Sequence, residues 1–119
     1  MKPEHYSDFA TEWISAWNSH DLESIMSHYS DQPEFSSPII QQMGVNEEGI
    51  ITSKAELRNY FERGLEKYPD LKFELLYVLK GVNSVVLFYK SINKMVTGEY
   101  MELNESGKVV RVKAHYAQQ

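Results

Sequence analysis

The stretch T-G-E-Y-M-E-L-N-E-S-G-K-V-V-R-V-K-A-H-Y, residues 97–116, decides the fold because two strand-like runs flank a turn-forming N-E-S-G segment. Apolar and polar side chains alternate in both runs, which is typical of antiparallel strands with one buried face. That face is apolar except at Glu99. The sequence therefore predicts a β-hairpin whose apolar face carries one carboxylate.

The orientation of Glu99 depends on the length of this turn, because a shift of one residue moves every side chain to the other face. A four-residue turn pairs Glu99 with Val112, and a two-residue turn pairs it with Ala114. Both lengths point the carboxylate inward. A three-residue turn pairs it with Lys113 and leaves an apolar stripe of the second strand facing outward. We therefore expect Glu99 to face the interior.

The region before the hairpin shows the same two-residue period. Turns at 81–83 and 92–94 separate strands expected at 71–80, 84–90, about 95–103 and 108–116, which together predict a four-stranded antiparallel meander. In the first strand, the pattern assigns Leu71, Phe73, Leu75, Tyr77 and Leu79 to the core side, and Leu76 and Val78 to a mixed opposite side.

Three amphipathic segments in the N-terminal half predict helices. Asp21 is a suitable N-cap for the second helix, which carries Leu22, Ile25, Met26 and Tyr29 on one side. Ser53 begins a capping box ahead of the third helix, which Pro69 ends. The first helix has apolar residues at the spacing of one helical face, namely Tyr6, Phe9, Ala10, Trp13, Ile14 and Trp17.

The segment between the second and third helices is read as an edge strand followed by a loop. Pro33 and Pro38 bracket a short extended piece, and proline is confined to sheet edges and strand ends. Residues 41–52 contain two glycines and read as a loop. The whole pattern predicts an α+β domain over residues 1–119, with three helices of the N-terminal half packed on one antiparallel sheet.

Composition excludes several classes of partner. The net charge is −5 and the basic residues are scattered, so the basic patch of a nucleic-acid-binding protein is missing. The chain has no cysteine, which excludes thiol catalysis and disulfides. No apolar leader and no run of membrane-spanning length is present, so we expect a cytoplasmic protein without a membrane partner.

Motifs for cofactors are also missing from the sequence. There is no glycine-rich phosphate loop, no G-x-S-x-G elbow and no H-E-x-x-H pair. His5, His20 and His28 lie in or beside the first two helices without the spacing of metal ligands, and surface or capping roles suit them better. We therefore expect no metal and no cofactor.

An inward carboxylate on an apolar wall has specific chemistry available to it. Loss of water around Glu99 disfavours its charged form and raises its pKa, so the group could donate a hydrogen bond or transfer a proton near neutral pH. The alternative is a solvated Glu99 at the mouth of the sheet, or one paired with lysine or arginine as a structural ion pair. Residue pattern alone leaves both open.

Four stretches resemble the nuclear transport factor 2-like superfamily, with its SnoaL-like branch and the ketosteroid isomerases as the nearest relatives. They are W-I-S-A-W-N-S-H-D-L-E-S-I-M-S-H-Y-S-D-Q-P-E-F-S-S-P at 13–38, I-T-S-K-A-E-L-R-N-Y-F at 51–61, P-D-L-K-F-E-L at 69–75 and L-N-E-S-G-K-V-V-R-V-K-A-H-Y at 103–116. The resemblance implies a cone-shaped, curved sheet wrapped around helices, and a deep apolar pocket. It also implies a homodimer through the outer sheet face, where Leu76, Val78, Val86 and Phe88 would suit the interface.

The catalytic residues of ketosteroid isomerases match this chain only in part. The position of the general base, before the proline that ends the first strand, holds Ser37 ahead of Pro38. The position of the oxyanion-binding tyrosine holds Trp13, which offers an indole N–H in place of a phenol. The position of the protonated aspartate holds Glu99. SnoaL-like cyclases use aspartate and histidine in the pocket, but His115 is expected on the outer face.

The resulting candidates are one catalytic residue and a set of pocket residues. For the large aromatic side chains, core packing is the competing explanation, since helical faces must be buried somewhere. Ser37 stands where the family's pocket opens. The catalytic candidate is Glu99, and the ligand-binding candidates are Trp13, Trp17, Ser37, Tyr60, Tyr89, Met101, Val112 and Tyr116.

Two functions follow as hypotheses. The first is a SnoaL-like protein that binds a small apolar or aromatic molecule, and that as an enzyme would perform cofactor-independent isomerisation, cyclisation or dehydration. The second is a noncatalytic ligand-binding or dimerisation module. Fold alone does not choose between them.

Overall fold

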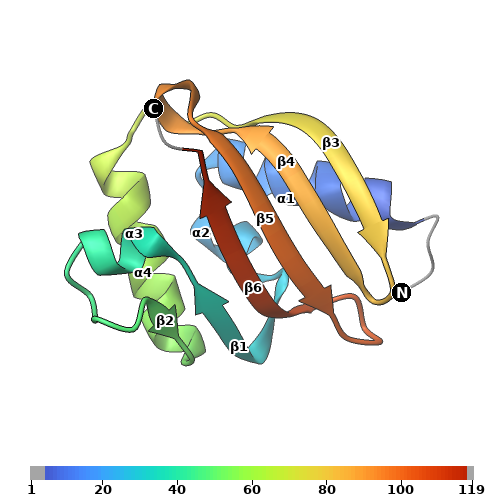
Figure 1. The fold of residues 1–119 in the computed structure, drawn as a ribbon, viewed down its shortest axis with the longest axis horizontal. Coiled ribbons are helices and arrows are strands. Elements are labelled where there is room, and N and C mark those ends of the chain that lie inside the picture. Colours follow the sequence, from blue (N-terminus) through green and yellow to red (C-terminus); the bar gives the residue numbers. More distant parts are fainter. Residues whose placement is uncertain (1–4, 118–119) are drawn as a thin grey trace.

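The structure, a computed structural model, describes residues 5–117, so the first four and last two residues of the expected domain lie outside the described part. Six strands form one curved, open sheet in the order β2-β1-β6-β5-β4-β3, and the helices belong to the N-terminal half of the chain (Figure 1). The α+β class is confirmed. None of the described helices is long and apolar enough to cross a membrane.

The helices begin where the sequence supplies caps. α1 spans Tyr6–Ser19 and buries the predicted aromatic face. α2 spans Leu22–Met26, and the Asp21 side chain accepts hydrogen bonds from the backbone N–H groups of Glu23 and Ser24. α4 spans Lys54–Lys67, and the Ser53 side chain accepts from the N–H of Glu56. These contacts satisfy N–H groups that the first turn of a helix cannot pair internally.

The meander of four antiparallel strands is confirmed. Its strands are β3 (Glu74–Gly81), β4 (Ser84–Lys90), β5 (Val96–Leu103) and β6 (Val109–Tyr116), with the short 3₁₀ helix η2 (Ile92–Lys94) between β4 and β5. The sheet is not wholly antiparallel, because β1 (Tyr29–Ser36) pairs with β6 in parallel.

The segment between α2 and α4 differs from its prediction. β1 is an edge strand only in its first half, because β2 (Ile50–Ile51) pairs with its end. Pro33 lies where the register with β6 shifts, which is a place where a ladder hydrogen bond can be lost. Residues 38–42 form a fourth α-helix, α3 (Pro38–Gln42), with Pro38 in its first turn and Ser37 as N-cap.

The terminal hairpin has a longer turn than any of the three lengths considered. Residues 104–108 connect β5 to β6, with Leu103 opposite Val109, and an irregularity between Glu102 and Leu103 changes the register. Beyond it, Glu99 stands opposite Ala114, as in the register of a two-residue turn. The bulge absorbs the extra residue, so the inward orientation of Glu99 is confirmed.

A second bulge, between Leu75 and Tyr77, corrects the prediction for β3. Tyr77 pairs with Phe88, and its side chain is 67% exposed, so it lies on the outer face and not in the core. Leu79 follows it outward, whereas Val78 packs against the core. On the outer face over β3 and β4, Tyr77 and Leu79 therefore join Val86 and Phe88, and Val78 leaves the set expected for a dimer interface.

The core lies between the inner face of the sheet and the helices, with α1 passing behind β4 and β5 in the view of Figure 1. The Trp13 ring of α1 lies 5.5 Å from the Tyr89 ring of β4, centroid to centroid. On α4, Phe61 meets Trp17 at 4.8 Å and Phe35 of β1 at 5.3 Å. Two helices and two strands thus contribute rings to one aromatic interior.

Candidate functional site

An interior cavity of about 100 Å³ opens among these aromatic side chains. Its deep wall comes from α1, α4 and the inner face of the sheet, and its half-exposed rim comes from α3, the end of α4 and the turn after β4. The lining residues are Trp13, Trp17, Phe35, Ile39, Met43, Tyr60, Phe61, Gly64, Tyr68, Leu71, Phe73, Tyr89, Ser91, Ile92, Met95, Glu99 and Tyr116.

Glu99 supplies the carboxyl group of this cavity. It is held in mid-strand on β5 between Leu87 of β4 and Ala114 of β6, and its side chain is 3% exposed. The hydroxyl of Tyr89 donates a hydrogen bond of 2.6 Å to Glu99 Oε1. Burial raises the pKa of Glu99 to about 7, and the Tyr89 hydrogen bond offsets part of that rise. Both protonation states are therefore available at neutral pH.

Four tyrosines interact electrostatically with Glu99. Burial is the main cause that raises the pKa of Tyr29, Tyr89 and Tyr116, and it raises the pKa of Tyr60 to about 12. The Glu99 charge raises each of them further. These phenols stay protonated near neutrality, so they can donate hydrogen bonds but cannot act as bases there.

The two tryptophans differ in how their indole N–H groups are used. Trp13 Nε1 donates to the Tyr29 hydroxyl at 3.1 Å, so the donor that the resemblance placed beside a ligand is already engaged. Trp17 Nε1 lies close enough to Tyr29 to lower the pKa of that phenol, but it does not meet hydrogen-bond geometry. Within residues 5–117 it is a buried donor without a partner.

Ser37 is buried beside the cavity and does not line it. Its hydroxyl accepts from the N–H of Ile39 at 3.1 Å as the cap of α3, and it lies close enough to Tyr60 and Tyr116 to lower the pKa of both phenols. Its own N–H donates to the carbonyl of Gly49. Gly49 has φ +72°, and a side chain there would press against Gln41, so glycine fits this contact.

The structure brings most of the predicted site residues together. Glu99 and five of the binding candidates, Trp13, Trp17, Tyr60, Tyr89 and Tyr116, line the cavity. Met101 and Val112 are buried on the inner sheet face but do not line the cavity.

Sequence reasoning missed Tyr29 and the rim. Tyr29 was assigned to the second helix, but it begins β1 and receives the Trp13 hydrogen bond. Of the rim residues, Met43 and Ile92 come from segments read as loop and turn, Ile39 ends the stretch read as an edge strand, and Met95 begins an expected strand. Their apolar character within polar surroundings was the one available signal.

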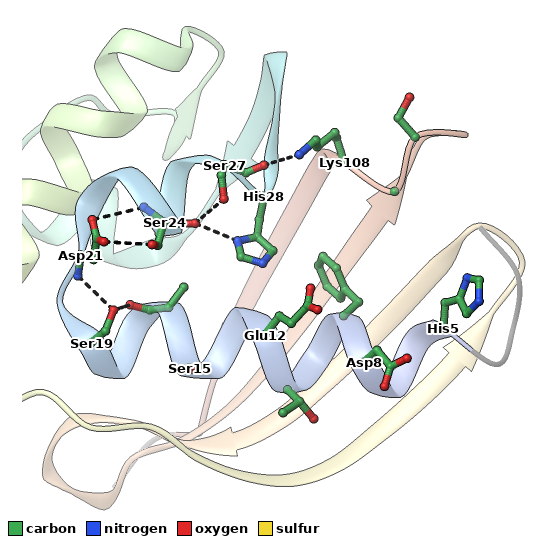
Figure 2. Close-up of a pocket in the computed structure, with 15 residues that line it drawn as sticks. His5, Asp8, Glu12, Ser15, Ser19, Asp21, Ser24, Ser27, His28 and Lys108 are labelled. Atoms are coloured by element: carbon green, nitrogen blue, oxygen red, sulfur yellow. Dashed lines mark hydrogen bonds between the residues drawn. The ribbon is translucent and has the colours of Figure 1, made fainter.

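A larger depression on the surface, of about 920 Å³, lies between α1, α2 and the turn of the terminal hairpin. Figure 2 shows the polar groups at its α2 end bonded to one another, whereas no bond is drawn to His5, Asp8 or Glu12 along α1. Asp21 accepts from Ser24, the His28 ring contacts the Ser24 carbonyl, and Lys108 donates to the Ser27 carbonyl. These bonds cap α2 and fasten the hairpin turn. Because the groups serve the fold and lie in a wide groove, we place the candidate site at the interior cavity.

Residues 5–117 contain no group of three or more His, Cys, Asp or Glu side chains arranged to hold a metal ion. His20 contacts the Leu71 carbonyl, and His115 is exposed on the outer face, as expected.

Comparison with known proteins gives one family and many similar structures. The family model described as SnoaL-like domain matches residues 10–117. A comparison with curated proteins gives no match. A SnoaL-like protein of unknown function from Burkholderia thailandensis is 37% identical over 98% of both chains, with a TM-score of 0.94.

More distant structures share the fold. A candidate ketosteroid isomerase from Kribbella flavida is 18% identical over 98% of this chain and 80% of its own, with a TM-score of 0.74. The epoxide hydrolase/cyclase-like enzyme SalBIII, of pyran ring formation in the polyether salinomycin, is 14% identical over 99% and 95%, with a TM-score of 0.80.

Proposed function

The chain belongs to the SnoaL-like domain family of the NTF2-like superfamily, and from this premise we propose that it binds a small apolar or aromatic molecule in the cavity beside Glu99. The observation that supports this most is a carboxyl group, 3% exposed, on the wall of an aromatic cavity. A buried carboxyl without an ionic partner costs stability, so its presence on the cavity wall suits a role toward a ligand.

As an enzyme, the protein would use Glu99 for cofactor-independent proton transfer. The carboxylate would accept a proton from a carbon beside a carbonyl group. Return of the proton to another carbon gives isomerisation, and its transfer to a leaving hydroxyl, which departs as water, gives dehydration. A pKa of about 7 suits this role, because an acid–base group works best when its pKa lies near the working pH. Tyr89 would orient the group through Oε1 and leave Oε2 for the substrate.

The steroid isomerase reaction is not part of this proposal. Ser37 occupies the position of the general base, and its hydroxyl already accepts a hydrogen bond from the α3 backbone and interacts with the phenols of Tyr60 and Tyr116. An aliphatic hydroxyl has no pKa near neutrality and no neighbouring histidine within that hydrogen-bond set to activate it.

A second candidate is a binding module without turnover. It is favoured by the small cavity and by the aromatic side chains that fill most of the interior. We also propose that the exposed apolar face of Tyr77, Leu79, Val86 and Phe88 joins two copies of the chain, because apolar side chains gathered on a sheet face are typical of an interface.

Tryptophan fluorescence tests the first proposal, because Trp13 and Trp17 both line the cavity. Titration with a panel of apolar compounds should change the emission, and Glu99→Gln should weaken binding. Glu102→Gln is the matched control, since Glu102 lies on the same strand but pairs with Arg111 on the outside. No change of emission with any compound contradicts the binding proposal, and binding without turnover supports the module.

A further inference from the structure

The size of the cavity limits what it can hold. Its volume of about 100 Å³ is smaller than the cavity of about 150 Å³ that, engineered into another protein, admits benzene. A single ring would therefore need a slight opening, and two fused rings would need the wall to be rebuilt. The half-buried Met43 and Met95 at the rim are flexible side chains that can provide the slight opening.

The deep wall cannot yield as easily, because its rings support one another. Trp13 stacks on Phe73 at 5.9 Å with an interplanar angle of 20°, and Phe73 lies 4.7 Å from Tyr89. Trp17 meets Phe61 edge to face at 4.8 Å. Moving one ring disturbs the next, and close-packed interiors resist such changes.

The charge of the lining restricts the ligand further. No lysine, arginine or histidine lines the cavity among the described residues. An anionic ligand would lie beside Glu99 with no cation to balance it. A cationic ligand would give up its water for one carboxyl group that already accepts a hydrogen bond from Tyr89. Both transfers are costly in an apolar site, which leaves an uncharged ligand.

Among the hydrogen-bonding groups of the lining, Glu99 offers a ligand one free carboxyl oxygen. Ser91 donates to the Met95 carbonyl, and the Tyr60 and Tyr116 phenols interact with Ser37, which does not line the cavity. Tyr89 occupies Oε1 of Glu99, so Oε2 is the carboxyl oxygen left for a ligand.

We infer that the cavity selects an uncharged planar compound of one ring or smaller that offers a single hydrogen-bonding oxygen to Glu99. This inference rests on the proposed function and narrows it to a substrate class, that of simple phenols and cyclic enones. A polycyclic ligand would exceed the size of this cavity and is therefore excluded from the substrate class.

The test is a binding panel measured by isothermal titration calorimetry on the full chain. The probes are phenol, 2-cyclohexenone, benzene, 1-naphthol, benzoate and benzylamine. Phenol and cyclohexenone should bind at least about tenfold more tightly than benzene, which lacks the oxygen, since a hydrogen bond to a charged or ionisable group has that effect on affinity. Naphthol, benzoate and benzylamine should bind more weakly than phenol.

Two variants locate the cause. Glu99→Leu removes the carboxyl that bonds the ligand oxygen, so phenol and benzene should bind it with nearly equal affinity. The variant should still fold, because it replaces a buried polar group with an apolar one. Met43→Ala widens the rim without touching the deep wall, and it should leave the preference for one ring unchanged. Glu102→Gln should behave as the unchanged protein, because Glu102 lies outside the cavity.

The outcomes separate this inference from the proposed function. Tighter binding of naphthol, benzoate or benzylamine than of phenol overturns the inference and leaves a binding protein of another selectivity. Equal affinity for phenol and benzene in the unchanged protein overturns the role of Glu99 Oε2. Failure of every probe to bind contradicts the proposed function itself.

Discussion

Replacement of Glu99 by glutamine should stabilise the protein at alkaline pH. Burial raises the pKa of Glu99 from its ordinary value of 4.5 to about 7, so the folded chain holds this proton more tightly than the unfolded chain does. As pH rises above 4.5, the unfolded chain loses the proton first, and unfolding becomes easier. The loss of stability is complete once pH exceeds the folded pKa.

The size of the effect follows from the shift. Each unit of pKa corresponds to 1.36 kcal/mol, so a shift from 4.5 to about 7 gives roughly 3 kcal/mol of stability lost between pH 4.5 and 7. Glutamine keeps an oxygen that can accept the Tyr89 hydrogen bond but cannot ionise. The variant should therefore gain up to this amount over the unchanged protein at pH 8 and much less at pH 5.

Urea unfolding followed by tryptophan fluorescence at pH 5, 6, 7 and 8 measures this difference. Glu102→Gln removes one exposed member of an ion pair with Arg111, and its effect should be small over the same range. The reasoning is refuted if the difference between Glu99→Gln and the unchanged protein stays constant with pH, or if it reverses sign toward alkaline pH.

Three further results are expected. Affinity for an acceptor-only ligand such as cyclohexenone should fall as pH rises through about 7, because only the protonated Glu99 carboxyl donates the hydrogen bond. The phenols that interact with Glu99 do not titrate in this range, namely Tyr29, Tyr60, Tyr89 and Tyr116. Calorimetry showing constant affinity from pH 5 to 9 would contradict the role of Glu99. Leu79→Lys places a charge on the proposed dimer face, so it should shift the sedimentation coefficient from that of a dimer to that of a monomer. Ile50→Lys, at the other end of the sheet, should leave the dimer intact. Equal behaviour of the two variants would locate the interface elsewhere. Ser53→Ala should destabilise the fold by about 1 kcal/mol in urea, since it removes the cap of α4, and an unchanged midpoint would show that the cap is dispensable.

The elements with strong local signals were predictable from the sequence. The aromatic stripe of α1, the Asp21 and Ser53 caps and the period of two in β4 to β6 each follow from short-range chemistry, and each is present in the structure. The inward direction of Glu99 followed as well, although its pairing arises from a five-residue turn and a bulge.

The errors come from interactions that a local pattern does not contain. The bulge after Leu75 reverses the faces of Tyr77 and Leu79, and its position depends on pairing with β4, which is invisible in the β3 sequence. Helix α3 is only five residues long, too short for its period to stand out. The parallel contact of β1 with β6 joins segments far apart in the chain.

For the site, the sequence identified the carboxyl and the aromatic wall but not their limits. Alternation places Met101 and Val112 on the inner face, but it does not encode how the helices pack over that face, which decides whether a residue lines the cavity. The hydrogen bond from Trp13 to Tyr29 could not be predicted, because β1 begins at Tyr29, which was read as part of the second helix.

The most direct test of the central claim is a ¹³C NMR titration of the Glu99 carboxyl carbon with and without phenol. A midpoint near pH 7 is expected in the free protein, and both the chemical shift and the midpoint should change when phenol binds. A midpoint near the ordinary 4.5 that phenol leaves unaltered would contradict the claim, because it would mean that Glu99 is neither desolvated nor in contact with the ligand.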